Sequence, residues 1–295
     1  MYVITGANGN VGRRLAEILL AEGKKVRVVS RNVDRLQPLA HRGAEVCMGS
    51  LQDEAFLAQT FRGARAAYVM IPPNHQAENL RAYQNRVGNV IFNVLKNAGV
   101  DYIVNLSSLG AHRPDKTGPV LGLYDQEQRL NWLEKANLVH LRPTFFMENL
   151  LSNVHLIKTR GINGTPLRGD LALPMVATKD IARVASEYLL ELGFKGIVVR
   201  ELLGQRNISM NEMTQILGKA IGLNNLQYVQ FSFEEAESSM IEAGFSRDVA
   251  QSLLQLYGSI NERIVIVGTE RTDENTTETP FEEFAESFAA AYGAG

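Results

Sequence analysis

Three glycines near the start of the chain, Gly6, Gly9 and Gly12, have the spacing of a phosphate-binding turn. They follow an apolar run at residues 1–4 and precede a helical apolar repeat that begins at Val11. Glycine lets the backbone turn tightly and approach a ligand closely, and a helix N-terminus offers free N–H groups to an anion. The order strand, glycine turn, helix therefore predicts a dinucleotide site, with a purely structural turn as the alternative.

The residue that follows the second predicted strand, residues 26–30, indicates which nicotinamide dinucleotide would bind. At that place an acidic residue accepts from the ribose hydroxyl of NAD, whereas a basic residue neutralises the 2′-phosphate of NADP. The chain has Arg31 there and no carboxylate before Asp34. The planar guanidinium matches phosphate geometry. We therefore expect NADP(H) as the preferred cofactor and NAD(H) as a possible one; an arginine exposed only to water is the alternative reading.

Alternating strand and helix patterns must position these residues. The first half of the chain predicts strands at residues 1–4, 26–30, 44–48, 66–71, 102–106 and 138–142. Between them, helices are predicted from Val11 onward, from a capping box at Ser50 through Phe61, and at residues 77–98 and 124–136. Repeated units of this kind predict an α/β fold with a doubly wound parallel Rossmann sheet, whose carboxyl edge carries the glycine turn.

The pattern changes after residue 150, which suggests a domain boundary. Residues 1–150 are expected to form the NAD(P)-binding domain, and residues 151–295 a smaller, mainly helical substrate lobe. About 176–202, with a helix from Asp180 and a strand at 196–202, should return to the sheet. Later helix starts are predicted at Ser209, Ser232 and Thr279, and a polar surface loop at 268–279.

Composition limits the class of protein. The chain has 295 residues, 45% of them hydrophobic, and a net charge of −2, so neither nucleic acid nor an anionic membrane is an expected partner. The single cysteine, Cys47, can form no internal disulfide, and the five histidines show no metal-ligand spacing. Without a signal peptide or an apolar membrane span, a cytoplasmic setting is expected. The oligomeric state stays open.

Several separated strings resemble the NmrA-like branch of the atypical short-chain dehydrogenases/reductases. Besides the glycine turn and Arg31, they are Leu141-Arg142-Pro143-Thr144-Phe145-Phe146-Met147-Glu148-Asn149, Lys179-Asp180-Ile181-Ala182 and Thr279-Pro280-Phe281-Glu282-Glu283-Phe284. The resemblance covers nearly the whole chain. It implies a nicotinamide cofactor and a Rossmann fold. Members of this branch include quinone and dye reductases as well as redox-sensing regulators without known turnover.

The resemblance also implies positions for the cofactor and the substrate. Cofactor contacts would come from Thr5, Gly6, Asn8, Gly9, Asn10, Val11, Gly12, Arg31, Ser50, Leu51, Ile71, Pro72, Pro73, Ser107, Pro143, Thr144 and Phe145. The family usually has an aspartate at the position of Ser50. The substrate pocket would include Ser108, Tyr124, Glu148 and Asn149.

The proton-transfer residues of an ordinary short-chain reductase are incomplete. Such an enzyme uses a serine, a tyrosine and a lysine four residues after the tyrosine, which lowers the pKa of the phenol. Ser107 or Ser108 stands at the serine position, and Tyr124 follows Ser108 by sixteen residues. The residue four after Tyr124 is Gln128, which carries no charge. Tyr124 and Ser107 are therefore weak catalytic candidates, and Tyr124 as a packing aromatic is the alternative.

The missing lysine favours acceptors that need no tuned acid. The cofactor performs hydride transfer, and the protein supplies orientation and excludes water. A quinone or a conjugated dye could take its proton from solvent and stack on Tyr68, Tyr124, Phe145 or Phe146, although core packing is the default role for each of these rings. Glu127 could orient a substrate, although a solvated helical glutamate is the default. The leading hypothesis is an NADPH-dependent oxidoreductase acting on a small molecule. The alternative is an NADP(H)-binding redox sensor with a regulatory protein partner.

Overall fold

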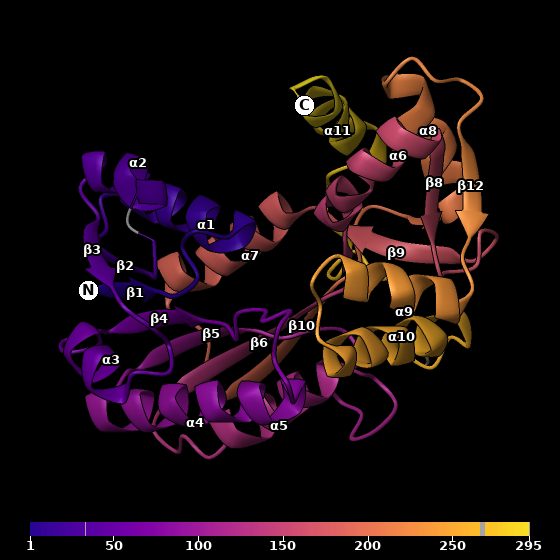
Figure 1. The fold of residues 1–295 in the computed structure, drawn as a ribbon. Helices are drawn as coiled ribbons and strands as arrows, with labels where there is room; N and C mark the ends of the chain where they lie inside the picture. Colours follow the sequence, from indigo (N-terminus) through magenta and orange to yellow (C-terminus); the bar gives the residue numbers. More distant parts are fainter. Residues whose placement is uncertain (33, 266–268, 295) are drawn as a thin grey trace.

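The computed structural model describes residues 1–32, 34–265 and 269–294. Its main feature is a seven-stranded parallel sheet in the order β10-β6-β5-β4-β1-β2-β3 (Figure 1). The strands are β1 Tyr2–Ile4, β2 Val26–Ser30, β3 Glu45–Met48, β4 Ala66–Val69, β5 Tyr102–Leu106, β6 Asn137–Pro143 and β10 Ile197–Leu202. The order reverses at β1, so the doubly wound Rossmann sheet is confirmed.

Helices cover both faces of this sheet. One face carries α1 Asn10–Ala21, α2 Gln37–His41 and α7 Thr178–Glu191, and the other carries α3 Glu54–Thr60, α4 Leu80–Ala98 and α5 Val120–Leu130 (Figure 1). A short 3-10 helix, η1 Asp34–Leu36, precedes α2. Alternate residues of each strand serve the two layers, because successive strand side chains point to opposite faces. In β1, Ile4 joins the core under α1, whereas Val3 joins the core under α4.

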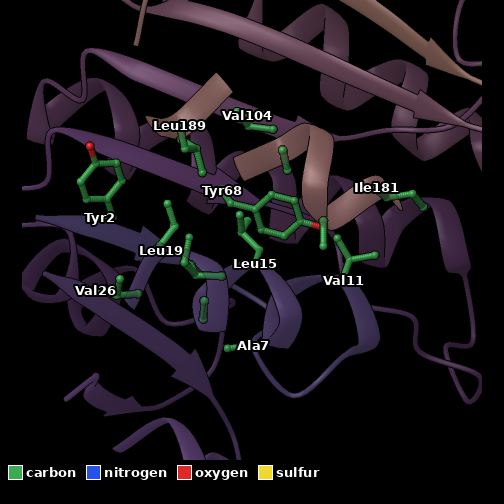
Figure 2. Close-up of a cluster of buried hydrophobic side chains, with 14 of the residues drawn as sticks. Tyr2, Ala7, Val11, Leu15, Leu19, Val26, Tyr68, Val104, Ile181 and Leu189 are labelled. Carbon is green, nitrogen blue, oxygen red and sulfur yellow. The ribbon is translucent and has the colours of Figure 1, made fainter. Parts of the chain in front are cut away.

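The core under α1 and α7 fixes the helix that follows the glycine turn. Figure 2 shows the ring of Tyr68 among Leu15 and Val11 of α1 and Ile181 of α7. Tyr68 is only 1% exposed, so the expectation that its ring could stack on a substrate is wrong. Its period-2 position in β4 points it into the core rather than toward the carboxyl edge of the sheet.

The remaining elements lie beyond the β10 end of the main sheet (Figure 1). They form two small sheets, β11-β9-β7 and β12-β8, with strands β7 Phe145–Phe146, β8 Ile162–Thr165, β9 Ala172–Val176, β11 Asn207–Ser209 and β12 Gln227–Gln230. The helices are η2 Met147–Asn153, α6 Val154–Arg160, α8 Met210–Ala220, α9 Phe233–Glu242, α10 Arg247–Asn261 and α11 Phe281–Ala294. The C-terminal region is helical, as expected, but it also contains strands that the sequence did not reveal.

Two helix starts differ from the sequence expectation for local reasons. α3 begins after Asp53, whose carboxylate accepts from the N–H of Phe56, while the Ser50 hydroxyl accepts only from the N–H of Gln52. The predicted capping box at Ser50 is therefore wrong. α5 begins at Val120, four residues before the predicted start, and in its first turn Gly122 lies against Gln84 of α4, where a side chain would collide.

Other predicted boundaries also shift by a few residues. β4 ends at Val69, two residues before the predicted end, and α5 ends at Leu130 rather than at residue 136. Asn131 and Trp132 form a turn there, although Leu133 continues the apolar pattern into the core. The chain must turn at this point because β6 already begins at residue 137.

The polar stretch before α11 is partly buried. Gly268, the first residue of the predicted surface loop, lies outside the described residues. Thr277 and Thr279 are nearly inaccessible to solvent. The backbone carbonyl of Asn275 accepts from the N–H of Leu203, which ties the stretch to the end of β10. Thr279 does not cap its own helix; it bonds to Asp180 of α7. The described part of the stretch is a loop with residues 270, 272–274 and 278 exposed, as expected, but its end is buried against α7.

None of the helices in these described ranges is both long and apolar enough to cross a lipid bilayer.

Candidate functional site

The glycine turn joins β1 to α1, and within it the backbone at Gly12 packs closely against the backbone at Gly6. Gly6 has a positive φ of 65°, which suits glycine, and Gly9 is the N-cap of α1 without a side-chain cap. A Cβ at Gly12 would lie 2.5 Å from the carbonyl oxygen of Gly6. Thr5 fixes the start of the turn, because its hydroxyl accepts from the N–H of Met70, 3.1 Å away, next to β4. The N-terminal N–H groups of α1 are thus left available to an anion.

A cavity of about 550 Å³ lies against this turn, at the carboxyl ends of β1 to β4. Its walls are Gly6, Asn8, Gly9, Val29, Ser30, Arg31, Asn32, Arg35, Gly49, Ser50, Leu51, Gln52, Met70, Pro72, Pro73, Tyr83 and Val87. The structure therefore brings eight of the expected cofactor residues around one space: Gly6, Asn8, Gly9, Arg31, Ser50, Leu51, Pro72 and Pro73.

The chemistry of these walls fits a phosphorylated dinucleotide. The glycine cradle would be closed by any side chain at residue 12. Asn8 donates through its amide nitrogen to Ser30 and to the carbonyl of Asn32, and its buried Oδ1 has no partner among the described residues. Arg31 and Arg35 supply two exposed cations to the same walls. The cavity thus combines anion-binding N–H groups with positive charge on one side.

Nine wall residues were not among the residues expected to bind the cofactor: Val29, Ser30, Asn32, Arg35, Gly49, Gln52, Met70, Tyr83 and Val87. Tyr83 and Val87 lie one turn apart on α4. Their spacing in the sequence predicted only that they face the core, and both do pack in the core under α4. Burial raises the pKa of the Tyr83 phenol, while Arg31 and Arg86 oppose that rise. The signal that could have found Tyr83 is its position on the first turns of the helix that follows Pro72 and Pro73.

The other expected cofactor residues lie elsewhere. Asn10 and Val11 open α1, Val11 pointing into the core beneath it (Figure 2), and Ile71 is buried under α4. Ser107 follows β5, Pro143 is the last residue of β6, Thr144 comes next, and Phe145 begins β7. Among these, Thr144 is tied to β10, since its N–H and its hydroxyl both donate to the carbonyl of Leu202.

A buried ionic cluster occupies the ends of β5 and β6. The Ser107 hydroxyl donates to Oε1 of Glu127 at 2.5 Å. Arg142 grips the same carboxylate, with Nε 3.0 Å from Oε1 and a terminal nitrogen 2.5 Å from Oε2. The Glu127 side chain is 2% exposed, so the expectation of a solvated helical glutamate is wrong. The bidentate arginine compensates the cost of burying the charge.

A second set of hydrogen-bonded polar side chains, Asn105, His140 and Asn131, lies next to this cluster. His140 accepts from the amide nitrogen of Asn105 at 3.0 Å and donates from Nε2 to Asn131 at 2.9 Å, a tautomer assigned from these amide partners. Burial lowers the pKa of His140 to about 4, so the ring is neutral near pH 7. Residues two apart on a strand share a face, as His140 and Arg142 do on β6. Asn131 directly follows α5, and its N–H still donates to the carbonyl of Glu127, so the pairs His140/Arg142 and Asn131/Glu127 meet in register.

The remaining catalytic and substrate candidates form no hydrogen bond with one another among the described residues. Tyr124 is half-buried on α5, and Gln128, at the missing lysine position, points to solvent. The Ser108 hydroxyl is bonded to the neighbouring carbonyl of Leu109. Glu148 accepts from the N–H and hydroxyl of Thr178, and Asn149 is exposed. The described ranges contain no cluster of three or more acidic, histidine or cysteine side chains that could hold a metal ion.

The sequence of the whole chain has a family relationship that agrees with this architecture. The profile of the NmrA-like family matches residues 2–285, and the chain belongs to this family.

Individual relatives have different activities. The NAD(P)H azoreductase of Xenophilus azovorans is 26% identical over 302 aligned residues, covering 100% of both chains. The triphenylmethane reductase of a Citrobacter species, solved as a complex with NADP(H), superimposes with a TM-score of 0.78 at 20% identity, covering 98% of this chain and 99% of that one. The negative transcriptional regulator NmrA, solved with NADP, gives a TM-score of 0.77 at 15% identity, covering 99% and 97%. The chain is thus similar to two proteins named as enzymes and to one named as a regulator.

Proposed function

We propose that the protein is an NADPH-dependent oxidoreductase that transfers hydride to a quinone-like or conjugated small molecule. One observation carries the proposal: the 550 Å³ cavity places the glycine turn and Arg31 on the walls of the same space. Such a pairing suits a pyrophosphate together with a 2′-phosphate. The relatives named for NAD(P)H or NADP(H) support this choice of cofactor.

Each part of the cavity has a role in binding. The backbone N–H groups between Gly9 and the first turn of α1 would hold the pyrophosphate. Arg31, with Arg35 beside it, would hold the 2′-phosphate, and Tyr83 with Leu51 would enclose the adenine. When bound, the nicotinamide supplies the hydride. We assign cofactor binding to residues 1–150 and the substrate lobe to residues 151–295, with 176–202 packed on the sheet.

The class of acceptor follows from what surrounds Tyr124. Gln128 is exposed and uncharged, so it cannot lower the pKa of a tyrosine as a lysine would. An acceptor that needs a protein acid, such as a ketone, is poorly served. A quinone or an extended dye can take its proton from water. The names of two relatives, which refer to azo compounds and triphenylmethane dyes, support conjugated acceptors.

A sensor of the NADP(H) ratio is the second candidate. The structural similarity to NmrA, which is described as a transcriptional regulator, favours it. In that case the cofactor site would be retained, and a protein partner would replace the small-molecule substrate.

The two candidates are separated by measuring cofactor binding and turnover together. Purified protein is titrated with NADPH and NADH, and NADPH oxidation is then followed with a quinone, an azo dye and a triphenylmethane dye. The proposal expects tight NADPH binding and turnover with at least one of these acceptors. Tight binding without turnover on any acceptor would favour the sensor. Failure to bind either nucleotide would reject both.

A further inference from the structure

The hydroxyl of Ser107 has a single proton, which it donates in a hydrogen bond to Glu127. Ser107 is 4% exposed and its oxygen lies 2.5 Å from Oε1 of Glu127. The serine is the donor in this pair, because the Glu127 carboxylate is ion-paired with Arg142 and acts as the acceptor. The lone pairs of the serine oxygen are then its remaining means of binding a ligand.

Arg142 forms an ion pair with Glu127. Its guanidinium donates to both carboxylate oxygens in the forked geometry of an arginine–carboxylate pair. The Arg142 side chain is itself 13% exposed. Glu127 therefore accepts three hydrogen bonds, one of which fixes the rotation of the serine hydroxyl. This arrangement prevents Ser107 from acting as a proton donor unless the cluster rearranges.

The sheet places this oxygen on the path of a dinucleotide. The N–H of Ser107 donates to the carbonyl of Leu141, which fixes the residue at the end of β5 beside β6. β5 adjoins β4, and the residues after β4, Met70, Pro72 and Pro73, line the cavity described above. A dinucleotide whose adenine half lies in that cavity extends across the carboxyl ends of the strands toward β5. This step rests on the proposed function.

We propose that Glu127 and Arg142 hold Ser107 as a hydrogen-bond acceptor for the carboxamide NH₂ of the nicotinamide. Ser107 is then a cofactor-binding residue and not the proton donor of the reaction, and Glu127 is a positioning residue that acts through it. Because the Ser107 proton is donated to Glu127, the site offers no serine proton to the substrate, which suits acceptors that take their proton from water.

The first test measures the dissociation constant for NADPH in the wild type, Ser107→Ala and a control, Ser186→Ala, which removes a buried hydroxyl of α7 that donates to the carbonyl of Arg183. Loss of one hydrogen bond should raise the dissociation constant about three- to tenfold in Ser107→Ala, with no change in the control. The turnover number with a dye acceptor should fall by less than about tenfold. A fall of about a hundredfold or more, with unchanged NADPH affinity, would identify a proton donor and overturn the proposal.

Two further arms identify the ligand group and the role of Glu127. With the 3-acetylpyridine analogue of NADPH, which lacks the NH₂ group, Ser107→Ala should bind as tightly as the wild type. Glu127→Gln should weaken NADPH binding, but not when Ser107→Ala is already present. An equal loss in both backgrounds would show a merely structural role. A wild type that does not bind NADPH rejects the proposed function, whereas a wild type and Ser107→Ala that bind it equally reject only the assignment of Ser107.

Discussion

Glu148 closes the N-terminus of α7, where its carboxylate accepts from both the N–H and the hydroxyl of Thr178. Two residues later on the same helix, Asp180 accepts from the N–H and the hydroxyl of Thr279. These two carboxylates join three segments that are far apart in the sequence, and each segment carries one of the strings that resemble the NmrA-like family. The strings therefore mark a structural junction beside the sheet.

Replacing Glu148 with alanine should lower the free energy of unfolding by about 1–2 kcal/mol, because α7 loses a capping carboxylate at the positive end of its dipole. Thermal or denaturant unfolding measures this loss. Glu187→Ala, on the exposed part of the same helix, is the control and should change stability by less than about 0.5 kcal/mol. If Glu148→Ala instead lost activity on its substrate with full stability, the placement of Glu148 at the substrate pocket would be right.

The local patterns predicted the sheet well because each depends on a few neighbouring residues. The apolar runs of β2 and β5 have the predicted bounds, and the glycine turn leads into α1 as expected. The strands of the C-terminal region escaped prediction for the opposite reason. β8 contains Gly164, a residue type that disfavours strands but that here lies against Phe231, a contact that only the folded chain creates.

The residues of the candidate site also differ in whether a local pattern in the sequence could predict them. Arg31 and the glycines could be predicted, since their function depends on the ends of β1 and β2. The burial of Glu127 could not be predicted, because it depends on an ion pair with Arg142, which lies on another element. In the sequence, Arg142 was notable only as part of a string that resembles the family. Tyr83 was likewise indistinguishable from a core residue, since a helix face can serve the core and a cavity wall together.

Replacing Gly12 with alanine tests the cradle. The new Cβ would lie 2.5 Å from the carbonyl oxygen of Gly6, so the turn must open. We expect a loss of about 1–3 kcal/mol in unfolding free energy and at least about tenfold weaker NADPH binding. Gly23→Ala is the control. Gly23 lies just after the C-terminus of α1 and has a positive φ, and no heavy atom lies within 4 Å of the position that a Cβ would take. It should cost some stability and leave NADPH affinity unchanged. Wild-type affinity in Gly12→Ala would argue against a cradle.

Replacing Arg31 with glutamate tests the choice between cofactors. The 2′-phosphate would lose a charged hydrogen bond and meet a negative charge, so NADPH affinity should fall about thirtyfold or more. NADH has no such phosphate, and its affinity should change by less than about threefold. Titration of both nucleotides gives the comparison. Arg42→Glu, an exposed arginine that follows α2 and lies outside the cavity walls, controls for net charge. An equal loss for NADPH and NADH would show that Arg31 does not read the phosphate.

His140 should make the protein less stable in mild acid. Burial lowers the folded-state pKa of this ring from 6.5 to about 4, so between these pH values the unfolded chain binds a proton that the folded chain does not. Its contribution is therefore complete above pH 6.5 and is lost as the pH falls toward 4, about 3 kcal/mol in all. His140→Gln removes the titration, so its unfolding free energy should fall less steeply across this window than that of the wild type. The exposed His155 on α6, replaced in the same way, is the control and should keep the wild-type slope. Equal slopes in the wild type and His140→Gln, measured by denaturant unfolding at several pH values, would mean that the buried ring does not contribute to the acid sensitivity.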